Sequence, residues 1–528
     1  MEQIDLDFIF SEIPEAKFKK LTPDQLYEFL KLEQQFRIRL QKEVNELKKE
    51  LAKPIEQLKF LTDEKYIGLK NRFFGSSTER REYEAKENPS KNSKPKSEKS
   101  KKILLPSERY PHAPVHVTDI EFKELPSCTC CGHQMKDTGM VEESEYLHVI
   151  PKQYRVIVQR RHKYSCGQCY GAVTTAPAPL RIKEGSAYSD AMMIDVAMSK
   201  YCDLVPVERY AAIAAREGFK GIPSNSLIES THYVADYIRG AYECIKDEVI
   251  KAQWLHADET PHKMLEGDAK SHWYLWSFSS PKACYYEYHN TRSGLVASDL
   301  LKKSACEFLL SDVFSGYSKA VSDSNEYRGQ KNLPRLKNAY CNAHARRKFI
   351  EAEPNFANQA GYFIKAYQQI YLLEKQAQER PLHERQKYRD QMRPIFEQMR
   401  QQGYEYLKSV SDKSSLVKAI TYFIGNYEGL TLCLSHCFLP LDNNAAERAL
   451  RSPVVGRKTW YGTHSKLGAK TAAILFSVVE SCKLNQVNPR EYVKRLVLDL
   501  HDGKTAYSPA TYAVKLAAEA ELAKQTLQ

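Results

Sequence analysis

Three acidic residues that lie far apart in this sequence stand where they could share a metal ion. Asp258 and Asp312 each follow a short apolar run, WLHA and FLLS, and Glu447 belongs to the Asn-rich segment PLDNNAAERALR. Strands that end side by side bring such acids to one point, where carboxylate oxygens are the ligands that Mg²⁺ or Mn²⁺ prefers. The pattern predicts metal-dependent phosphodiester chemistry, with these three residues as catalytic groups and metal ligands.

Each acid also has a simpler explanation. An aspartate after a strand is more often a turn or helix-cap residue. Asn444 can cap the helix AAERALR, which would make Glu447 a capping-box residue at the third position of that helix. The prediction therefore depends on the pair of aspartates and its strand context, and not on either residue type alone.

The region from about 250 to 312 predicts the elements that would bring the two aspartates together. AQWLHAD, SHWYLWSFS and ACYYEYH predict three consecutive strands, RSGLVASDLLKK a helix, and CEFLLSD a fourth strand. Three antiparallel strands, a crossover helix and a further strand are the opening of a ribonuclease H-like fold. Asp258 would then lie at or just beyond the first strand, and Asp312 at the end of the fourth, which is adjacent to the first.

The chain between Asp312 and Glu447 is too long for a simple connection. Residues 356–409 are rich in Gln, Glu, Lys and Arg and predict a helical insertion that could cover the site or contact DNA. An apolar helix over 471–482 and another after Pro489 should complete the core.

Two basic segments near the acids are candidate DNA contacts. In YCNAHARRKF the basic residues are compact, and in RSPVVGRKTWYG cations adjoin a Trp after a turn predicted at Pro453 and Gly456. The alternatives are a solvated helix face for the first segment and a core position for the Trp. The candidate DNA-binding residues are His344, Arg346, Arg347, Lys348, Arg448, Arg457, Lys458 and Trp460.

Two Cys-x-x-Cys pairs predict a structural zinc site. Cys128 with Cys131, and Cys166 with Cys169, have the spacing that turns two thiolates toward one tetrahedral Zn²⁺. A strand-like stretch, YRVIVQRRHKYS, leads into the second pair and predicts a zinc ribbon with a long hairpin. Cys130 leaves open which thiol joins Cys131, and reduced cysteines without metal are the alternative.

Residues 188–240 predict three helices separated by short turns. Pro206 should start the second helix, and Ser224 or Ser226 should cap the third. The turn GFKGIP between these helices gives the outline of a helix-turn-helix, whose last helix would enter a major groove. A small helical packing domain is the alternative, because the last helix carries one Arg and no Lys.

The N-terminal part of the chain predicts a helix and then a tether. From Leu26 to Leu61 a leucine-rich heptad indicates a dimerising coiled coil, with an amphipathic helix packed on its own protein as the alternative. Residues 84–102 consist mainly of Lys, Ser, Pro, Glu and Asn and predict a disordered basic linker.

Composition is compatible with a protein that acts on nucleic acid. At 528 residues the chain should divide into several domains, and its net charge of +12 favours a polyanionic partner. The acidic start MEQIDLDFIF and the lack of a long apolar run predict neither a signal peptide nor a membrane span, so the cytoplasm is the expected compartment. Thirteen cysteines, most of them scattered singly, fit reduced core thiols better than a disulfide framework.

Four segments resemble conserved blocks of the transposases of the insertion-sequence sixty-six family. They are LHADETPHKML, LLSDVFSGY, YCNAHARRKF and LDNNAAERALRSPVVGRKTWYG. The resemblance runs over nearly the whole chain, from the leucine-zipper region ending near FFGSSTERR to a C-terminal domain around ESCKLNQVNPREYVKRL. In it, Asp258, Asp312 and Glu447 match the family's acidic triad, and Asn342 departs from the Trp that relatives often carry.

The resemblance implies a bacterial DDE transposase that cuts at insertion-sequence ends and joins them to target DNA. It implies two Mg²⁺ (or Mn²⁺) ions at the acids, structural Zn²⁺, and terminal inverted repeats and target DNA as partners. A homo-oligomer is expected because two DNA ends must be joined, and small accessory proteins of the same element are further partners. The alternatives are a ribonuclease H-like nuclease that only hydrolyses DNA, and a noncatalytic zinc-containing DNA-binding regulator.

The expected fold class is multidomain α+β, with an N-terminal coiled-coil helix, a zinc ribbon, a helix-turn-helix-like helical domain and a ribonuclease H-like catalytic core with a helical insertion. The expected segments are a helical leucine-zipper region at 1–83, a disordered basic linker at 84–106, a zinc-ribbon domain at 107–183, a helix-turn-helix-like domain at 184–248, the first part of the core at 249–350, a helical insertion at 351–429, the second part of the core with the catalytic Glu at 430–482, and a C-terminal helical domain at 483–528.

Overall fold

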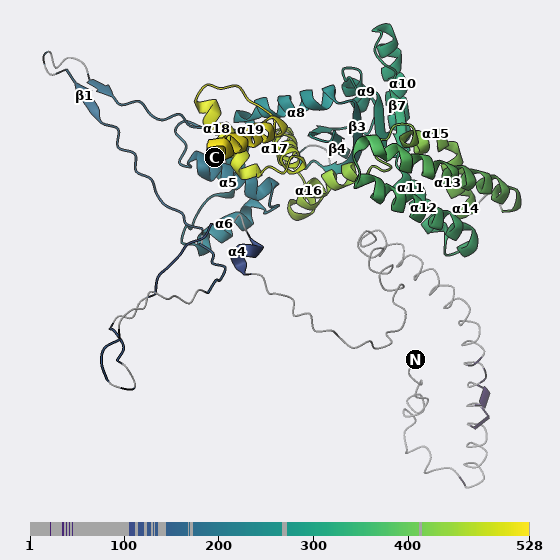
Figure 1. Cartoon of the computed structure of the whole chain (residues 1–528), viewed down its shortest axis with the longest axis horizontal. Coiled ribbons are helices and arrows are strands. Elements are labelled where there is room, and N and C mark those ends of the chain that lie inside the picture. Colours follow the sequence, from purple (N-terminus) through teal and green to yellow (C-terminus); the bar gives the residue numbers. More distant parts are fainter. Residues whose placement is uncertain are drawn as a thin grey trace. The chain divides into compact units, whose positions relative to one another are not determined.

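The computed structural model describes most of the chain from residue 105 onward (Figure 1). Clustering of its contacts divides the chain into two units, Met1–His148 and Val149–Gln528. The predicted linker at 84–102 lies outside the described residues, as does almost all of the predicted coiled coil at 26–61. The described residues are 22, 34, 35, 38, 39, 42, 45, 105–110, 114–120, 124–127, 130, 132–135, 144–150, 152–166, 168, 173–266, 272–410 and 414–526.

The first unit contains the short helix α4 (Pro106–Arg109). Ser107 donates hydrogen bonds of 2.8 Å from both its backbone nitrogen and its hydroxyl to the carboxylate of Glu145. Further along, Ser127 pairs with Gln134 in an antiparallel bridge. This bridge encloses the first Cys-x-x-Cys segment, which is the local arrangement that a tight knuckle needs.

The second unit begins with a small antiparallel hairpin. Strands β1 (Lys163–Ser165) and β2 (Val173–Thr175) pair with Lys163 opposite Thr175 and Ser165 opposite Val173. The hairpin encloses the second Cys-x-x-Cys segment. Residues 154–162 of the predicted strand form no sheet ladder, so the paired part of the hairpin is shorter than the sequence predicts.

The helices predicted over 188–240 are present, and a fourth follows them. Glycines 218 and 221, with φ of +89° and +81°, form the predicted turn. The predicted serine cap of the third helix is wrong, because the helix starts directly after Pro223 and its first residues include both serines. The four helices are α5 (Asp190–Tyr201), α6 (Val207–Arg216), α7 (Ser224–Tyr237) and α8 (Arg239–Lys251).

Helix α7 packs into the main core as well as against α5. Val234 and Ala235 are buried there, and His232 Nδ1 lies 2.7 Å from the hydroxyl of Thr471 in helix α17 (Lys466–Leu484). The α7 face that carries these residues therefore packs inside the protein, as expected for a small helical packing domain.

A five-stranded mixed sheet lies at the centre of the second unit. Its order is β5-β4-β3-β6-β7, with β3, β4 and β5 antiparallel and with β6 and β7 parallel to β3. The four predicted strands are present, as is the predicted crossover helix, α9 (Leu295–Leu301). The fifth strand was not predicted. The strands are β3 (Trp254–Lys263), β4 (His272–Ser279), β5 (Cys284–His289), β6 (Phe308–Ser311) and β7 (Lys337–Tyr340), with helix α10 (Ser315–Gln330) between the last two.

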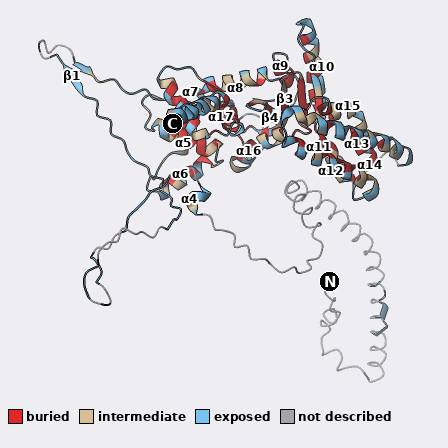
Figure 2. Ribbon diagram, in the orientation of Figure 1, coloured by how far each residue is buried: buried red, intermediate tan, exposed pale blue. Residues whose placement is uncertain are grey.

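Helix α17 covers the sheet near its β5 edge, and Figure 2 shows its strongly buried surface. The backbone nitrogens of Cys284 and Tyr286 donate hydrogen bonds of 3.0 Å to the hydroxyls of Ser481 and Ser477. Unpaired backbone groups on an edge strand invite pairing with another chain. Two serines on one face of α17 therefore satisfy and cover this edge.

A series of helices follows β7 and includes those of the segment predicted as a helical insertion, 351–429. These helices build a second hydrophobic core, which packs on the sheet through Phe308 of β6. Arg389 and Glu374 form a buried ion pair inside it, with 3.0 Å between Nη2 and Oε1. The helices are α11 (Asn342–Ala352), α12 (Ala357–Gln378), α13 (Leu382–Ser409), α14 (Ser415–Gly425) and α15 (Tyr427–Thr431), followed by a 3-10 turn at Leu432–Leu434.

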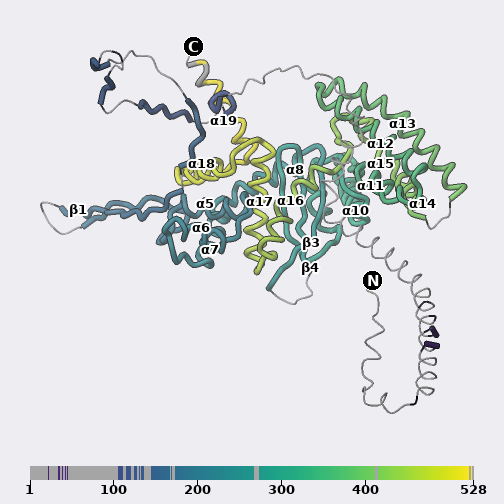
Figure 3. Tube along the Cα trace, turned by 90° about the horizontal axis from the view of Figure 1, so that it is seen from below, coloured from purple at the N-terminus to yellow at the C-terminus, as the bar shows by residue number. Residues whose placement is uncertain are grey.

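Helix α16 (Asn444–Trp460) returns the chain to the sheet, and Figure 3 shows it beside β3 and β4. The turn predicted at Pro453 and Gly456 is wrong, because both residues lie inside this helix. Pro453 has no backbone N–H and cannot donate to the carbonyl of Ala449. The Tyr286 hydroxyl donates to that oxygen at 2.7 Å instead. A tertiary hydrogen bond thus compensates for the local helix breaker.

Two more helices end the described chain, α18 (Pro489–His501) and α19 (Pro509–Thr526). Together with α17, the first of them confirms the helices predicted for this region. Among the described helices, none is both long enough and apolar enough to cross a membrane.

Candidate active site

The two aspartates are brought together by the register of β3 and β6. These strands pair in parallel, with Trp254 opposite Phe308 and His256 opposite Leu310. Continuing the same register by two residues sets Asp258 opposite Asp312, where neighbouring strands are about 4.8 Å apart. Asp258 lies within β3 rather than at its end, because β3 goes on pairing with β4 beyond the end of β6.

The pKa of Asp258 depends on the charges of the other two acids. Burial first, and then the charges of Glu259, Asp312 and Glu447, raise the pKa of its carboxyl to about 8, against a hydrogen bond of 2.9 Å from the Glu259 backbone nitrogen. Like charges disfavour ionisation of a carboxyl only when they lie near it. The three predicted residues are therefore neighbours in the fold.

Asp312 has a local role as well. Its Oδ1 accepts a hydrogen bond of 3.1 Å from the backbone nitrogen of Phe314, the residue that precedes helix α10. This is the turn interaction that the simpler explanation expects. Because the turn uses Oδ1, it is compatible with a metal-binding role for the other carboxylate oxygen.

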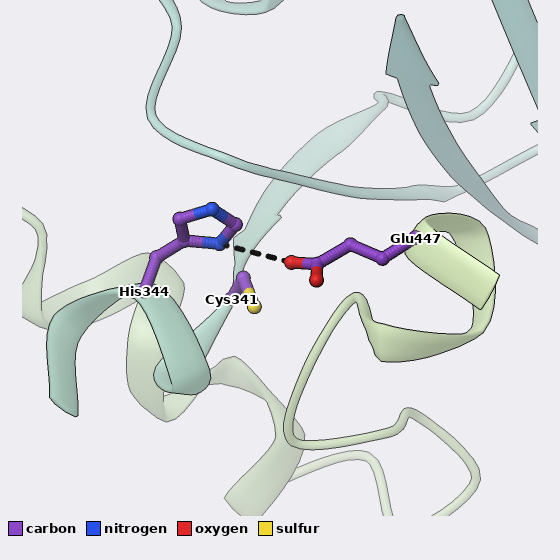
Figure 4. A group of neighbouring side chains, drawn as sticks. All are labelled: Cys341, His344 and Glu447. Atoms are coloured by element: carbon purple, nitrogen blue, oxygen red, sulfur yellow. Dashed lines mark ion pairs between the residues drawn. The ribbon is translucent and has the colours of Figure 1, made fainter. Parts of the chain in front are cut away.

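The capping explanation for Glu447 is wrong in its details. Asn443 precedes helix α16 and Asn444 is its first residue, so Glu447 occupies the fourth position, and no capping box forms. Its Oε1 instead lies 3.7 Å from Nδ1 of His344, which comes from the first turn of α11. Figure 4 shows the two side chains pointing toward each other from different helices.

Asn443 fastens the start of α16 to strand β3. It is only 1% exposed, its Nδ2 donates to the carbonyl of Ala257 at 2.9 Å, and its Oδ1 lies 2.6 Å from Nδ1 of His256. Both partners immediately precede Asp258. One buried amide therefore fixes the start of the helix that carries Glu447 against the strand that carries Asp258.

The other end of α16 is fastened to the same strand. The backbone nitrogen of Thr463 donates to the carbonyl of Lys263 at 3.1 Å, and its hydroxyl lies 2.9 Å from Nε2 of the buried His262. Gly462 makes this approach possible: its φ is +121°, and a Cβ there would come within 2.2 Å of the Lys263 carbonyl oxygen. Helix α16 is thus held along β3 at both ends.

A fourth acid at this site was not singled out from the sequence. The carboxylate of Glu259 is 2% exposed and lies 2.6 Å from the guanidinium of Arg292. The Tyr317 hydroxyl donates to its other oxygen. This carboxylate is therefore already paired, although its position directly after Asp258 was a visible signal.

The basic residues predicted on α11 divide into two groups. The side chain of His344 points toward Glu447. Burial lowers the pKa of its imidazole, although the negative charge of Glu447 acts in the opposite direction. Arg347 is exposed, Arg346 is half-buried, and Nζ of Lys348 lies 4.7 Å from the centre of the Tyr422 ring. Only the arginines and the lysine therefore remain candidates for phosphate contact.

The basic residues predicted on α16 also differ in their surroundings. Arg448 and Lys458 are exposed, whereas Arg457 is half-buried and its Nη1 lies 3.4 Å from the Thr260 hydroxyl. Trp460 packs against the main core, and a Cβ on Gly456 would come within 2.6 Å of its ring. The core alternative for Trp460 is the one the structure favours.

Asn342, the residue that departs from the family pattern, is fully buried at the start of α11. Its Nδ2 donates to the carbonyls of Leu430 and Leu441 at 2.9 and 3.0 Å, and its Oδ1 accepts from the Tyr367 hydroxyl at 3.3 Å. Every polar group of the side chain is thus satisfied. The amide joins α11 to the segment that leads into α16.

The predicted zinc ligands lie mostly outside the described residues. Cys166 is described and exposed, but Cys128, Cys131 and Cys169 are not described. Cys130, the residue that left the pairing open, is exposed. The two antiparallel pairings that enclose these segments are the part of the predicted ribbon that the structure contains.

The residues at the acidic cluster suit a divalent cation. The donors are carboxylate oxygens, as Mg²⁺ prefers, and their mutual repulsion raises the pKa of Asp258. Oε1 of Glu447 is buried and has no hydrogen-bond partner within the described part of the chain. A cation would relieve the repulsion and satisfy this oxygen.

Comparisons with known proteins identify the family to which this chain belongs. The model of the transposase IS66 family matches residues 185–471, and a model for the zinc-finger binding domain of transposase IS66 matches residues 126–170. Two uncharacterized proteins of Sinorhizobium fredii (strain NBRC 101917 / NGR234) are also similar. The protein y4hP is 26% identical over 71% of this chain and 71% of its own length, and y4jD is 27% identical over 75% of this chain and 78% of its own length. Since the first model covers more than half of the chain, this protein belongs to the IS66 family of transposases, as its sequence blocks predicted, and it carries that family's zinc-finger domain.

Proposed function

We propose that this transposase cleaves DNA at the ends of its insertion sequence and transfers the freed ends into target DNA. Asp258, Asp312 and Glu447 are the catalytic carboxylates of this reaction. The observation that carries the proposal is the parallel register of β3 and β6, which continues to Asp258 and Asp312, together with the influence of Asp312 and Glu447 on the buried carboxyl of Asp258. Such strongly perturbed groups gather at functional sites.

The sheet supports assignment of the core to the ribonuclease H-like class. Three antiparallel strands followed by two parallel strands, in the order β5-β4-β3-β6-β7, give the layout expected for that fold. In it, the first and fourth strands are neighbours, and each carries one aspartate. The helical insertion of α12 to α15 then separates the second and third acids in sequence while α16 returns the third to the site.

The chain's own residues hold and orient the reacting groups. Mg²⁺ or Mn²⁺ bound to these carboxylates would activate the attacking oxygen and stabilise the leaving oxygen of a phosphodiester. Asp258 must lose its proton to act as a ligand, and the raised pKa means that cation binding and proton release are coupled. Asn443 keeps Glu447 in place during both reactions.

The partners follow from the same proposal. Exposed Arg347, Arg448 and Lys458 lie on the two helices that supply His344 and Glu447, where they can contact DNA phosphates. Cys128, Cys131, Cys166 and Cys169 are the proposed zinc ligands. A homo-oligomer, formed through the leucine-rich segment, would hold two element ends together, with small accessory proteins of the same element as further partners.

The proposal is tested with single amide variants of the acids. Asp258→Asn, Asp312→Asn and Glu447→Gln should each abolish Mg²⁺-dependent nicking of a DNA fragment that carries an element end, and binding of that fragment should persist. Asp299→Asn is the matched control, because this aspartate is 78% exposed on α9. Unchanged nicking by the three site variants would refute the assignment.

The same assay separates a transposase from a nuclease of the same fold. Pre-cut element ends are incubated with a supercoiled plasmid and Mg²⁺, and joined products are analysed by gel electrophoresis. Joining supports strand transfer, whereas cleavage without joined product would indicate an enzyme that only hydrolyses DNA. Binding of the ends that is indifferent to Mg²⁺ and to the three variants would indicate a noncatalytic regulator.

A further inference from the structure

A second group of metal-ligating side chains adjoins Glu447. Cys341 directly precedes helix α11, and His344 lies in the first turn of that helix, three residues later. Residues with this spacing share one side of a helix. One ligand atom from each of Cys341, His344 and Glu447 lies within 4.8 Å of the other two (Figure 4).

Two of the three ligand atoms in this group lack a hydrogen-bond partner among the described residues. Nδ1 of His344 and Oε1 of Glu447 face each other at 3.7 Å, which is beyond hydrogen-bond distance. Both atoms are buried, and neither has a hydrogen-bond partner among the described residues. Leaving buried polar atoms without partners destabilises the fold. A cation between them would remove that destabilisation.

The sulfur of Cys341 is positioned as an acceptor. The backbone nitrogen of Asn443, at the start of α16, lies 3.1 Å from it and donates to it. Burial raises the pKa of the Cys341 thiol to about 12, and this hydrogen bond acts in the opposite direction, in favour of the thiolate that binds metals. The same residue that fastens α16 to β3 therefore also prepares the thiol.

The ligand set differs from that of the acidic cluster. Sulfur and imidazole nitrogen prefer Zn²⁺, Co²⁺ and similar ions, whereas Mg²⁺ prefers oxygen alone. Tetrahedral zinc with these ligands needs ligand atoms about 3.3 to 3.7 Å apart. The distance between His344 and Glu447 already meets this value. The thiol lies within 4.8 Å of both other ligand atoms, so it needs to approach by at most about 1 Å, which is within the reach of a side-chain rotation.

We propose that Cys341, His344 and Glu447 form a binding site for one thiophilic divalent ion, of the Zn²⁺ or Co²⁺ class, that shares Glu447 with the Mg²⁺ site. The thiol gives up its proton to solvent when the ion binds. A water molecule would complete the coordination, since three protein ligands leave one position open.

Sharing of Glu447 has a functional consequence, which depends on the function proposed above. An ion held by Cys341 and His344 draws the Glu447 carboxylate away from the acidic cluster. Zn²⁺ in slight excess over the zinc finger should therefore inhibit Mg²⁺-dependent nicking. The site would make transposition responsive to the supply of free transition metal.

Spectroscopy of bound cobalt tests the site without any activity. The full chain, with its zinc finger loaded with Zn²⁺, is titrated with Co²⁺, and the thiolate-to-cobalt absorption in the near ultraviolet is recorded. The wild type should bind one further equivalent with this absorption. Cys341→Ser should lose the band, and His344→Ala should weaken Co²⁺ binding by at least about tenfold.

Two controls keep the result interpretable. Cys437→Ser changes a half-buried thiol outside the group and should leave the band intact. His344→Ala alters a side chain that is 28% exposed, so it tests the site even if Cys341→Ser does not fold. A band that persists unchanged in Cys341→Ser and His344→Ala, or no band in the wild type, would overturn the proposal. If Asp258→Asn still nicks DNA and shows a normal cobalt band, the proposed function is refuted while the proposed metal site stands.

Discussion

The sheet and helix α16 place their acids at the candidate site in different ways. On the sheet, Asp258 and Asp312 become neighbours through the backbone register of β3 and β6, which is largely independent of side chains. Glu447 comes from a helix that follows the long insertion and is fastened to β3 by Asn443 at one end and by Gly462 and Thr463 at the other. Individual side chains therefore control the position of the third acid.

The largest effect among the fastening residues is expected at Gly462. Gly462→Ala would bring a Cβ within 2.2 Å of the Lys263 carbonyl, at a φ of +121° that side chains rarely adopt. The free energy of unfolding, measured with urea, should fall by about 2 to 4 kcal/mol, and nicking should fall with it. Gly361→Ala is the matched control, because nothing lies within 4 Å of a Cβ there and the helix should tolerate or favour it. Equal stability of the two variants would contradict this role.

Asn443→Ala should damage the other end of α16. It removes the hydrogen bonds to Ala257 and His256 and leaves buried groups unsatisfied, so the unfolding free energy should fall by about 1 to 3 kcal/mol. Nicking should fall more than DNA binding, since Glu447 loses its support. Asn444→Ala, the adjacent and less buried position, provides the control in the same assays. If both variants nick at the wild-type rate, this side chain does not position Glu447.

A pH dependence follows from the buried histidine at the Gly462 end. Burial lowers the pKa of His262 to about 4, well below the ordinary value of about 6.5. The unfolded state therefore takes up the proton first, so this contribution to stability is complete above about pH 6.5 and is lost as the pH falls toward 4. The loss should reach about 2 to 3 kcal/mol in urea unfolding at pH 4.5 compared with pH 7.

His262→Gln is the variant that isolates this effect, since it keeps a polar group near Thr463. Its unfolding free energy should change less with pH than that of the wild type. His256, whose pKa burial also lowers to about 4, remains in both proteins and supplies the residual dependence. A wild type and a variant with the same pH profile would rule out His262 as a source.

The smallest effect is expected on the sheet side. Ser477→Ala removes the hydroxyl that accepts from the Tyr286 nitrogen at 3.0 Å, which should cost about 1 kcal/mol of unfolding free energy. Nicking should be unchanged, because the register of β3 and β6 does not depend on this contact. A fall in nicking larger than the fall in stability would show that the sheet-borne acids also depend on side-chain support.

The same difference explains what could be predicted from the sequence. Alternating aromatic and apolar residues identified four strands and the crossover helix, and their order was enough to bring Asp258 and Asp312 together. The fifth strand, KNAY, was missed because four residues with little apolar character carry almost no periodic signal. Local patterns therefore predicted the part of the site that the backbone builds.

The part of the site that side chains build was harder to predict. Pro453 and Gly456 indicated a turn, but the Tyr286 hydroxyl and the Trp460 ring make a continuous helix favourable. The role of Asn443 depends on partners nearly two hundred positions earlier in the chain. For His344, its basic neighbours suggested phosphate contact, while the fold turns the imidazole to Glu447. Long-range contacts of this kind leave no local pattern.

Anomalous diffraction from crystals of the full transposase soaked with Mn²⁺ shows directly whether the three acids share a cation. An anomalous peak is expected at the carboxyl end of β6, with oxygens of Asp258, Asp312 and Glu447 all within coordination distance. A peak ligated by the two aspartates while Glu447 remains on His344, or no peak at this position, would contradict it.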